Sequence, residues 1–189
     1  MNNNFIRHSS ILKKENTALL IIDIQEKILR VMLNSEELIQ NTLKLIEGFK
    51  ILELPIFATE QYPKGLGETE GRIKESLKEI VPIQKMSFSC SGAGDLFETL
   101  KNKNINQIVV AGIEAHVCVQ QTALDLIANG FKVSLGADAC SSRKKIDYKI
   151  ALDRMKTAGI IVTTTEAILF ELLNVCGTDE FKQISKIVK

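Results

Sequence analysis

The sequence predicts a three-layer α/β/α sandwich around a mainly parallel, Rossmann-like sheet. Short apolar runs that are partly β-branched and closed by Asp or Gly have the pattern of strands buried on both faces. The clearest of these runs are residues 18–22, 108–111 and 132–135. Helical patterns separate them, and strands that alternate with helices pair in parallel between two layers of helices.

Two helices and two weaker strands follow from local patterns. Apolar residues recur at helical spacing over residues 36–53, and a second helix over 117–129 ends before Gly130, a residue that commonly stops helices. Shorter apolar runs at 55–58 and 160–162 are weaker strand candidates. These elements alternate as the sandwich requires.

The connections between these elements carry further signals. Thr163 and Glu166 have the spacing of a capping box, which opens a helix that runs through Leu173. Residues 61–71 are rich in Gly and contain a proline, which predicts a long loop over one end of the sheet. Residues 82–88 form a short extended run before a turn rich in Ser and Gly. Loops at such an edge can shape a pocket.

Size and charge limit the classes of function. A chain of 189 residues with 45% hydrophobic residues fits a single domain over residues 1–189, which can bury about 70% of its unfolded surface. The net charge of +1 is spread without a basic stripe, so we expect no nucleic-acid partner. Residues 1–7 lack the apolar core of a signal peptide, and no apolar run reaches the roughly 20 residues that span a bilayer. We expect a cytoplasmic protein that does not contact membranes.

Asp23 and Lys85 are candidate catalytic residues because of where they stand. Asp23 ends the first buried strand, where the alternative is a carboxylate that caps a turn or helix. Lys85 lies in the extended run at 82–88, where the alternative is an ordinary solvated lysine. Both fall at predicted strand ends on one edge of the sheet, which is where open parallel sheets bind ligands.

Cys118 is the candidate nucleophile. The four cysteines are far apart and form no C-x-x-C pair, so we expect free thiols. Most free cysteines are small buried hydrophobes, and that interpretation suits Cys140 and Cys176. Cys118 instead lies where the chain breaks at Gly112 and turns from a strand into a helix. The N–H groups and dipole of a helix N-terminus lower a thiol pKa from about 8.5, so we expect a thiolate at neutral pH.

Together these residues favour covalent catalysis. A carboxylate can accept the thiol proton, a cation can hold the charges together, and backbone N–H groups beside the thiol can bind an oxyanion. His116 is an alternative base, but two residues before Cys118 its side chain points to a different face, so we expect it in the pocket wall. The histidine and cysteine spacings predict no metal site, and no Gly-rich phosphate loop is present. We expect no cofactor.

At these residues the sequence resembles the isochorismatase-like cysteine hydrolase superfamily, over nearly its whole length from Thr17 to about Leu173. Thr-Glu-Gln-Tyr-Pro-Lys-Gly-Leu-Gly at 59–67 and Gly-Ile-Glu-Ala-His-Val-Cys at 112–118 look closest to the branch of isochorismatase domain-containing proteins. The other matching landmarks are Leu-Leu-Ile-Ile-Asp-Ile-Gln at 19–25, Lys-Met-Ser-Phe at 85–88, and Gly-Ala-Asp-Ala-Cys-Ser-Ser-Arg at 136–143.

The resemblance implies a fold and a set of roles. It implies the isochorismatase-like fold, with Asp23 as general base, Lys85 as the triad lysine and Cys118 as the nucleophile that forms a thioester acyl-enzyme. The backbone N–H groups of Glu114 and Cys118 would form the oxyanion hole, and the peptide bond between Ile113 and Glu114 would be cis. We also expect a homo-oligomer that takes a small-molecule substrate.

Three departures narrow what the resemblance implies. Nicotinamidases of the family place metal ligands after the second strand, whereas residues 59–71 contain no histidine, which argues against nicotinamide deamidation. Many relatives carry Thr three residues before the nucleophile, where this chain has Ala115. Isochorismatases that cleave a vinyl ether lack the nucleophilic cysteine, so Cys118 argues against that reaction.

The sequence therefore favours C–N bond hydrolysis in a small amide, ureide or carbamoyl substrate. The candidate pocket residues are Gln25, Gln61, Tyr62, Phe88 and His116. A second hypothesis is a non-catalytic family member that binds a metabolite or partner in the same pocket. A third is a thiol redox protein, which would need Cys90 or Cys140 as a resolving cysteine.

Overall fold

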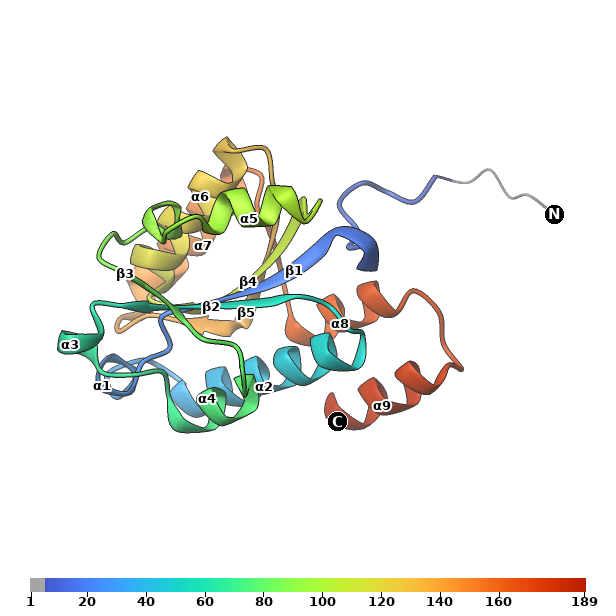
Figure 1. Cartoon of the computed structure of the whole chain (residues 1–189), viewed down its shortest axis with the longest axis horizontal. Coiled ribbons are helices and arrows are strands. Elements are labelled where there is room, and N and C mark those ends of the chain that lie inside the picture. Colours follow the sequence, from blue (N-terminus) through green and yellow to red (C-terminus); the bar gives the residue numbers. More distant parts are fainter. Residues whose placement is uncertain (1–5) are drawn as a thin grey trace.

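Six parallel strands form one sheet through the centre of the computed structural model, which describes residues 6–189 (Figure 1). Their order in the sheet is β3-β2-β1-β4-β5-β6, and every neighbouring pair is parallel. The predicted parallel sheet is therefore confirmed. The strands are β1 (Thr17–Ile22), β2 (Ile56–Gln61), β3 (Ile83–Lys85), β4 (Gln107–Ile113), β5 (Lys132–Ser141) and β6 (Ile161–Thr163).

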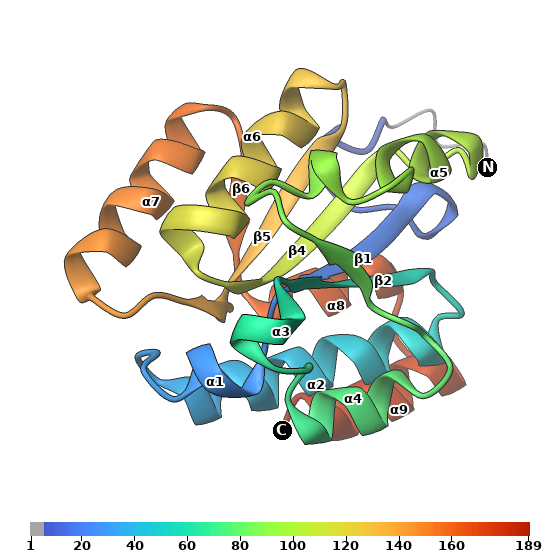
Figure 2. The same ribbon diagram turned by 60° about the vertical axis from the view of Figure 1, so that its left-hand side comes forward.

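Helices cover both faces of this sheet and complete the predicted three layers (Figures 1 and 2). One face carries α2 (Ser35–Ile51), α4 (Gly71–Leu77), α8 (Thr165–Leu173) and α9 (Asp179–Ile187). The other carries α5 (Leu96–Asn102), α6 (Gln120–Ala128) and α7 (Lys145–Thr157). Shorter pieces are the single turns α1 (Glu26–Leu29) and α3 (Pro63–Leu66), the 3₁₀ turns η1 (Lys14–Asn16) and η2 (Cys90–Gly92), and the π-helical segment η3 (Ala115–Val119).

Alternation along the central strands fills two separate cores. In β1, Leu19 and Ile21 pack into the cluster beneath α2, whereas Leu20 and Ile22 pack into the cluster beneath α5 and α6. Successive side chains of a strand point to opposite faces, so a strand buried on both sides is apolar at every position. This explains why β1 is one continuous apolar run.

Two local predictions need correction. The helix cap is Thr164 rather than Thr163, because Thr163 still belongs to β6 and the Thr164 side chain accepts a hydrogen bond from the Ala167 N–H. The stretch 61–71 is not irregular throughout, since it contains α3 and an isolated bridge between Gln25 and Thr69. The other predicted strands and helices are present within a few residues of their expected bounds, except that β5 continues to Ser141.

Within residues 6–189, no helix combines the length and apolar character needed to cross a membrane. The expectation about a signal peptide concerns residues 1–7, of which residues 1–5 lie outside the described part of the chain.

Gly112 lets the ends of the two central strands approach closely. It pairs with Ile22 across β1 and β4, and its φ of 141° lies in the region that favours glycine. A Cβ atom built on Gly112 would lie 2.2 Å from the carbonyl oxygen of Ile22. Only a glycine therefore fits where β1 leads to Asp23 and β4 leads to Cys118.

We expect Gly112→Ala to lower the free energy of unfolding by at least about 2 kcal/mol, because backbone strain and an overpacked contact each destabilise by roughly 1–3 kcal/mol. Urea denaturation followed by circular dichroism measures the change. Gly71→Ala is the matched control, since a Cβ at this first residue of α4 meets no atom within 4 Å. The control should keep or slightly raise stability. Equal stability of Gly112→Ala and the wild type would contradict the close approach.

Candidate active site

Three strands bring Asp23, Lys85 and Cys118 to one edge of the sheet. Asp23 directly follows β1, Lys85 is the last residue of β3, and Cys118 lies in η3 just after β4. In the sheet, β1 is next to β4 and is separated from β3 by β2, and parallel strands end on the same side. The proximity expected from the sequence is therefore present.

Lys85 is buried against Asp23 rather than solvated. Its side chain is 0% exposed, and Nζ lies 2.7 Å from Asp23 Oδ2 and 2.8 Å from Gln61 Oε1. The carbonyl oxygens of Ser87 and Phe88 accept from the same ammonium group, at 3.1 and 2.9 Å. An ammonium has three N–H donors, so four acceptors use its whole capacity. The solvated-lysine alternative is wrong.

Asp23 is held from both sides. Its Oδ2 accepts from Lys85, and its Oδ1 accepts from the Thr59 hydroxyl at 2.8 Å. Neither oxygen caps a helix, so the capping alternative is also wrong. Burial raises the pKa of Asp23 above its ordinary value, and the charge of Lys85 opposes that rise. The carboxyl group is thus a buried base with its counter-charge in contact.

The surroundings of Cys118 favour a protonated thiol over the expected thiolate. The residue is only 6% exposed, and burial, reinforced by the negative charge of Asp23, raises its pKa to about 12. Lys85 lowers this pKa, but by less than burial raises it. Cys118 lies in the π-helical turn η3, which leads directly into α6. The Asp23 carboxylate lies close enough to Cys118 to contribute to the rise of its pKa.

The segment before the thiol has the expected backbone geometry. The peptide bond between Ile113 and Glu114 is cis, and Glu114 precedes the π-helical turn that contains Cys118. The Glu114 carboxylate is buried and accepts from Arg143 Nε at 2.9 Å. This ion pair joins the segment before the nucleophile to the chain that follows β5.

Arg143 and Thr59 are site residues that sequence reasoning missed. Arg143 is the last residue of the matching segment at 136–143, which follows a predicted strand. A positive charge at the end of that strand could have suggested an ion pair with an acidic residue at the same edge of the sheet. Thr59 pairs with Ile22 across β1 and β2, and Ile22 directly precedes Asp23. This register is visible only in the structure, so no signal in the sequence could have found Thr59.

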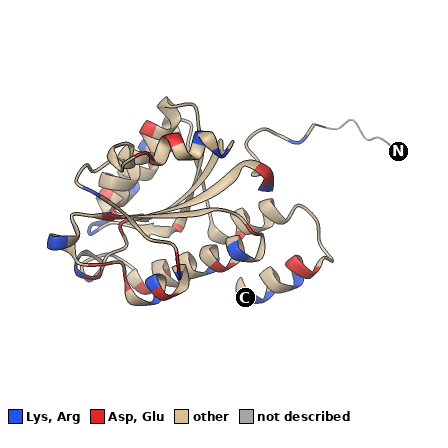
Figure 3. Cartoon of the chain, viewed as in Figure 1, with Lys and Arg blue, Asp and Glu red and all other residues tan. Residues whose placement is uncertain are grey.

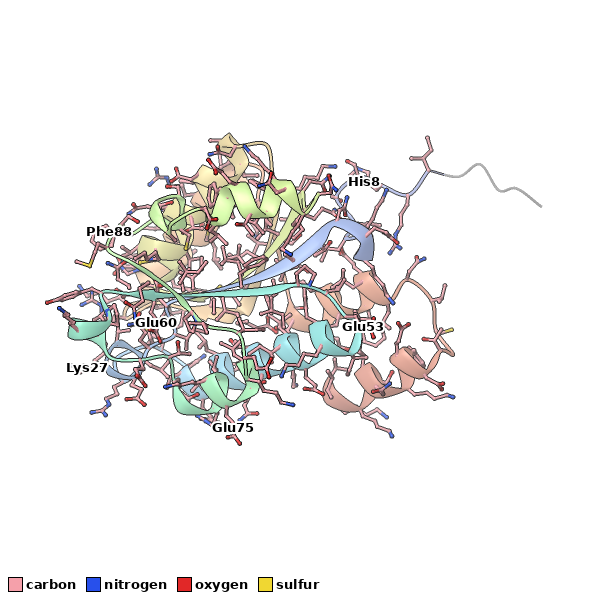
Figure 4. The ribbon with its side chains drawn as sticks, in the orientation of Figure 1. His8, Lys27, Glu53, Glu60, Glu75 and Phe88 are labelled. Carbon is pink, nitrogen blue, oxygen red and sulfur yellow. The ribbon has the colours of Figure 1, made fainter. Side chains whose placement is uncertain are left out.

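A small cavity opens onto Asp23 and Cys118. Its volume is about 70 Å³. The other residues that line it are Ile28, Gln61, Leu66, Phe88, Ile113, Glu114 and Val117. Phe88 lies at the same end of the molecule as Lys27 and Glu60, opposite Glu53 and His8 (Figure 4). Gln61 and Phe88, two of the candidate pocket residues, are thus on its wall.

The other three candidates occupy different positions. Gln25 is fully buried, and its amide bonds the carbonyls of Gln61 and Gly67 and the Gln61 N–H, so it fixes the loop after β2 instead of lining the cavity. Tyr62 is half-exposed at the start of α3.

His116 also lies off the cavity wall. Its Nδ1 lies 3.0 Å from the Ser142 hydroxyl, and its Nε2 lies 4.0 Å from Asp147 Oδ2. These contacts direct the ring toward the segment after β5 and the start of α7. Asp23, rather than His116, shares the cavity wall with Cys118.

A larger cavity of about 420 Å³ lies between α2, β5 and α7. Cys140 lines this larger cavity, and burial raises the pKa of its thiol to about 12. Asp138, the carboxylate beside it on the wall, accepts hydrogen bonds from the N–H and the hydroxyl of Thr165 and so anchors α8. We therefore take the smaller cavity, which contains Asp23 and Cys118, as the candidate active site. In the described residues, 6–189, no three His, Cys, Asp or Glu side chains cluster as a metal site would require.

Sequence comparison finds a family match for most of the chain. The model of the isochorismatase domain matches residues 17–167. Isochorismatase domain-containing protein 1 of Salmo salar is 39% identical over 92% of this chain, and the match spans 61% of that protein's length. Isochorismatase domain-containing protein 2 of Xenopus laevis is 35% identical over 97% of this chain and 88% of its own length.

Comparison of structures gives the same fold. The MAR1 ribonuclease of Caenorhabditis elegans superposes with a TM-score of 0.88, at 39% identity, over 94% of this chain and 91% of its own. The observed sandwich is therefore an isochorismatase-like fold.

We expect Lys85→Met to lower the free energy of unfolding by about 3–5 kcal/mol at neutral pH, because the Asp23 carboxylate would stay buried without its counter-charge. An acid whose pKa is raised by folding destabilises the folded state once the pH exceeds its unfolded value, which is 3.8 for Asp23. Without Lys85 this pKa rises further. The deficit should therefore shrink as the pH falls and Asp23 takes up a proton.

Denaturant unfolding at about pH 5 and about pH 8 measures this trend. The double variant Asp23→Asn/Lys85→Met is the control, since it removes both charges and should regain most of the loss. A deficit that does not depend on pH would argue against an ionised Asp23 in contact with Lys85.

We expect Asp23→Asn to slow the alkylation of Cys118 by iodoacetamide, because burial favours the protonated thiol and the carboxylate that can take its proton is lost. Asparagine keeps the size of the side chain but cannot act as a base at neutral pH. Mass mapping after brief treatment measures the rates. Cys176, which is exposed rather than buried as the sequence suggested, is the internal control. Unchanged or faster labelling of Cys118 would remove Asp23 as its proton acceptor.

Proposed function

The chain belongs to the isochorismatase family, and from that premise we propose that it is a cysteine hydrolase that cleaves a C–N bond in a small amide, ureide or carbamoyl compound. The observation that carries the proposal is that Cys118 and Asp23 line one cavity while Lys85 contacts Asp23 at 2.7 Å. A buried nucleophile, its base and a fixed cation are the components of covalent hydrolysis.

In the proposed first step, Asp23 accepts the thiol proton as Cys118 Sγ attacks the carbonyl carbon of the substrate. The N–H groups of Glu114 and Cys118 bind the oxygen that becomes negative. The C–N bond then breaks, Asp23 returns the proton to the leaving nitrogen, and ammonia or an amine departs. A thioester between Cys118 and the acyl group remains.

In the second step, Asp23 removes a proton from water, and the resulting hydroxide attacks the thioester. The C–S bond breaks, the carboxylic acid leaves, and the proton on Asp23 returns to the sulfur. Lys85 stabilises the carboxylate through its contact with Oδ2 whenever Asp23 is ionised. The raised pKa of Cys118 keeps the resting thiol protonated, so the sulfur becomes nucleophilic only when proton transfer accompanies attack.

The buried ion pair favours catalysis over the non-catalytic alternative. Replacing a buried ion pair by apolar residues of similar volume is often neutral or stabilising, so a pair such as Asp23 and Lys85 is a poor choice for stability alone. A pocket used only for binding would gain nothing from a carboxylate and a thiol on the wall of one cavity. Proton transfer between Cys118 and Asp23 would give the thiol and the carboxylate a function.

RNA is a second candidate substrate, because the Caenorhabditis elegans structure with 39% identity is described as a ribonuclease. The charge distribution offers it little support. The net charge is +1, and acidic and basic positions alternate along the ribbon (Figure 3). A protein that grips a phosphate backbone presents a continuous basic face. RNA is therefore included in the activity test below only as a substrate for comparison.

The expected homo-oligomer also remains a proposal. Ile146 and Ile150 lie one turn apart on α7 with more than half of each residue exposed, which suits contact with a second copy.

We expect Cys118→Ala to reduce ammonia release from a panel of small amides and ureides by at least about a thousandfold, since the nucleophile is lost. The fold should survive, because the change removes one sulfur atom beside an open cavity. Cys176→Ala, at an exposed cysteine, is the matched control and should keep full activity. Cleavage of RNA, and ammonia release in the presence of a chelator, are measured in parallel. Ammonia release that survives in folded Cys118→Ala protein would refute the mechanism.

A further inference from the structure

The polar side chains on the wall of the 70 Å³ cavity are already engaged by the protein. Asp23 accepts from Lys85 and Thr59. The Gln61 amide accepts from Lys85 and donates to the Met86 carbonyl at 2.9 Å. Of the two N–H groups on Gln61 Nε2, the bond to Met86 uses one. Apart from the other N–H, these side chains offer a substrate little spare hydrogen-bonding capacity beyond what its reacting carbonyl and leaving nitrogen require.

The charges on this wall disfavour an ionic substrate. Asp23 and Glu114 are the ionisable carboxyl groups among its lining residues, and both are paired with cations. Lys85 has no N–H left for a substrate carboxylate, because four protein oxygens surround its ammonium group. A substrate anion would face two acidic residues and no uncommitted cation on this wall.

The rest of the wall is apolar. Its members come from four places in the chain and share aliphatic or aromatic side chains. They are Ile28, Leu66, Phe88, Ile113 and Val117. Extra N–H or C=O groups of a substrate would lose water here without gaining partners, at a cost of about 1–3 kcal/mol for each unpaired group. An alkyl group suits this wall.

The volume limits the length of that alkyl group. One water molecule needs roughly 10–15 Å³ of such cavity volume, so a cavity of about 70 Å³ holds only about five to seven atoms of that size. Pockets for larger ligands run from about 300 to 1,000 Å³. An aromatic ring in addition to the amide group exceeds the available space.

We propose that the substrate is an uncharged amide with a short aliphatic acyl group, rather than a ureide, a carbamoyl compound, an aromatic amide or an amide that carries a carboxylate. This inference rests on the proposed function and narrows it from three substrate classes to one.

Phe88 is the wall residue that can be removed with least disturbance. It is 54% exposed, so truncation leaves no buried void, and its contact with Lys85 is through the backbone carbonyl, which a substitution retains. Phe88→Ala should therefore enlarge the cavity while the ion pair of Asp23 and Lys85 stays in place.

The test compares kcat/KM, from ammonia release, for propionamide, isobutyramide, benzamide, succinamate and N-methylurea. We expect the kcat/KM of the wild type for propionamide or isobutyramide to exceed its kcat/KM for benzamide, succinamate and N-methylurea by at least tenfold. In Phe88→Ala, the ratio of benzamide to propionamide should rise at least tenfold. Val81→Ala, which shortens an 81% exposed side chain that does not line the cavity, is the control and should leave this ratio unchanged.

The outcomes separate this inference from the function on which it rests. Preference for benzamide, succinamate or N-methylurea would overturn the substrate class and leave the cysteine hydrolase standing. A ratio that Phe88→Ala does not change would overturn the assignment of this cavity to the acyl group. Absence of ammonia release from every compound, with Cys118→Ala indistinguishable from wild type, would overturn the hydrolase proposal and the inference together.

Discussion

The ion pair between Asp23 and Lys85 is the contact on which the candidate site depends. Two opposite charges lie 2.7 Å apart and are almost fully buried, so neither can be moved from the other without leaving a charge in a poorly solvating interior. The pair also joins the ends of β1 and β3, which lie on either side of β2 in the sheet. The ion pair therefore fixes the Asp23 carboxylate beside Cys118. It also links Asp23 to Gln61, which accepts from the same ammonium group.

Much of this arrangement could be predicted from the sequence. Asp23, Lys85 and Cys118 each follow a strand or stand at its end, and the carboxyl ends of parallel strands share one edge of a sheet. The protonation of Cys118 could not be predicted, because it depends on how deeply other elements bury the thiol and on how close Asp23 lies. The rule that a helix N-terminus lowers the pKa of a thiol takes neither of these influences into account.

The partners of the site residues were harder to find. Thr59 bonds Asp23 across 36 positions of sequence, and Arg143 bonds Glu114 across 29. Hydrogen bonds over such separations are set by register and by loop paths, which apolar periodicity does not encode. The same reason explains why Gln25, expected on the pocket wall, lies beneath the loop, since its role depends on carbonyl groups whose positions the side-chain pattern does not report.

The hydrogen bonds of Gln25 give the loop after β2 an unusual freedom. They end on the backbone groups of Gln61 and Gly67, so these bonds do not depend on the side chain at Leu66 between them. Leu66 lines the cavity. A substitution at this position would therefore reshape the cavity wall, while the anchors of the loop and the contacts of Asp23 with Lys85 and Thr59 stay in place.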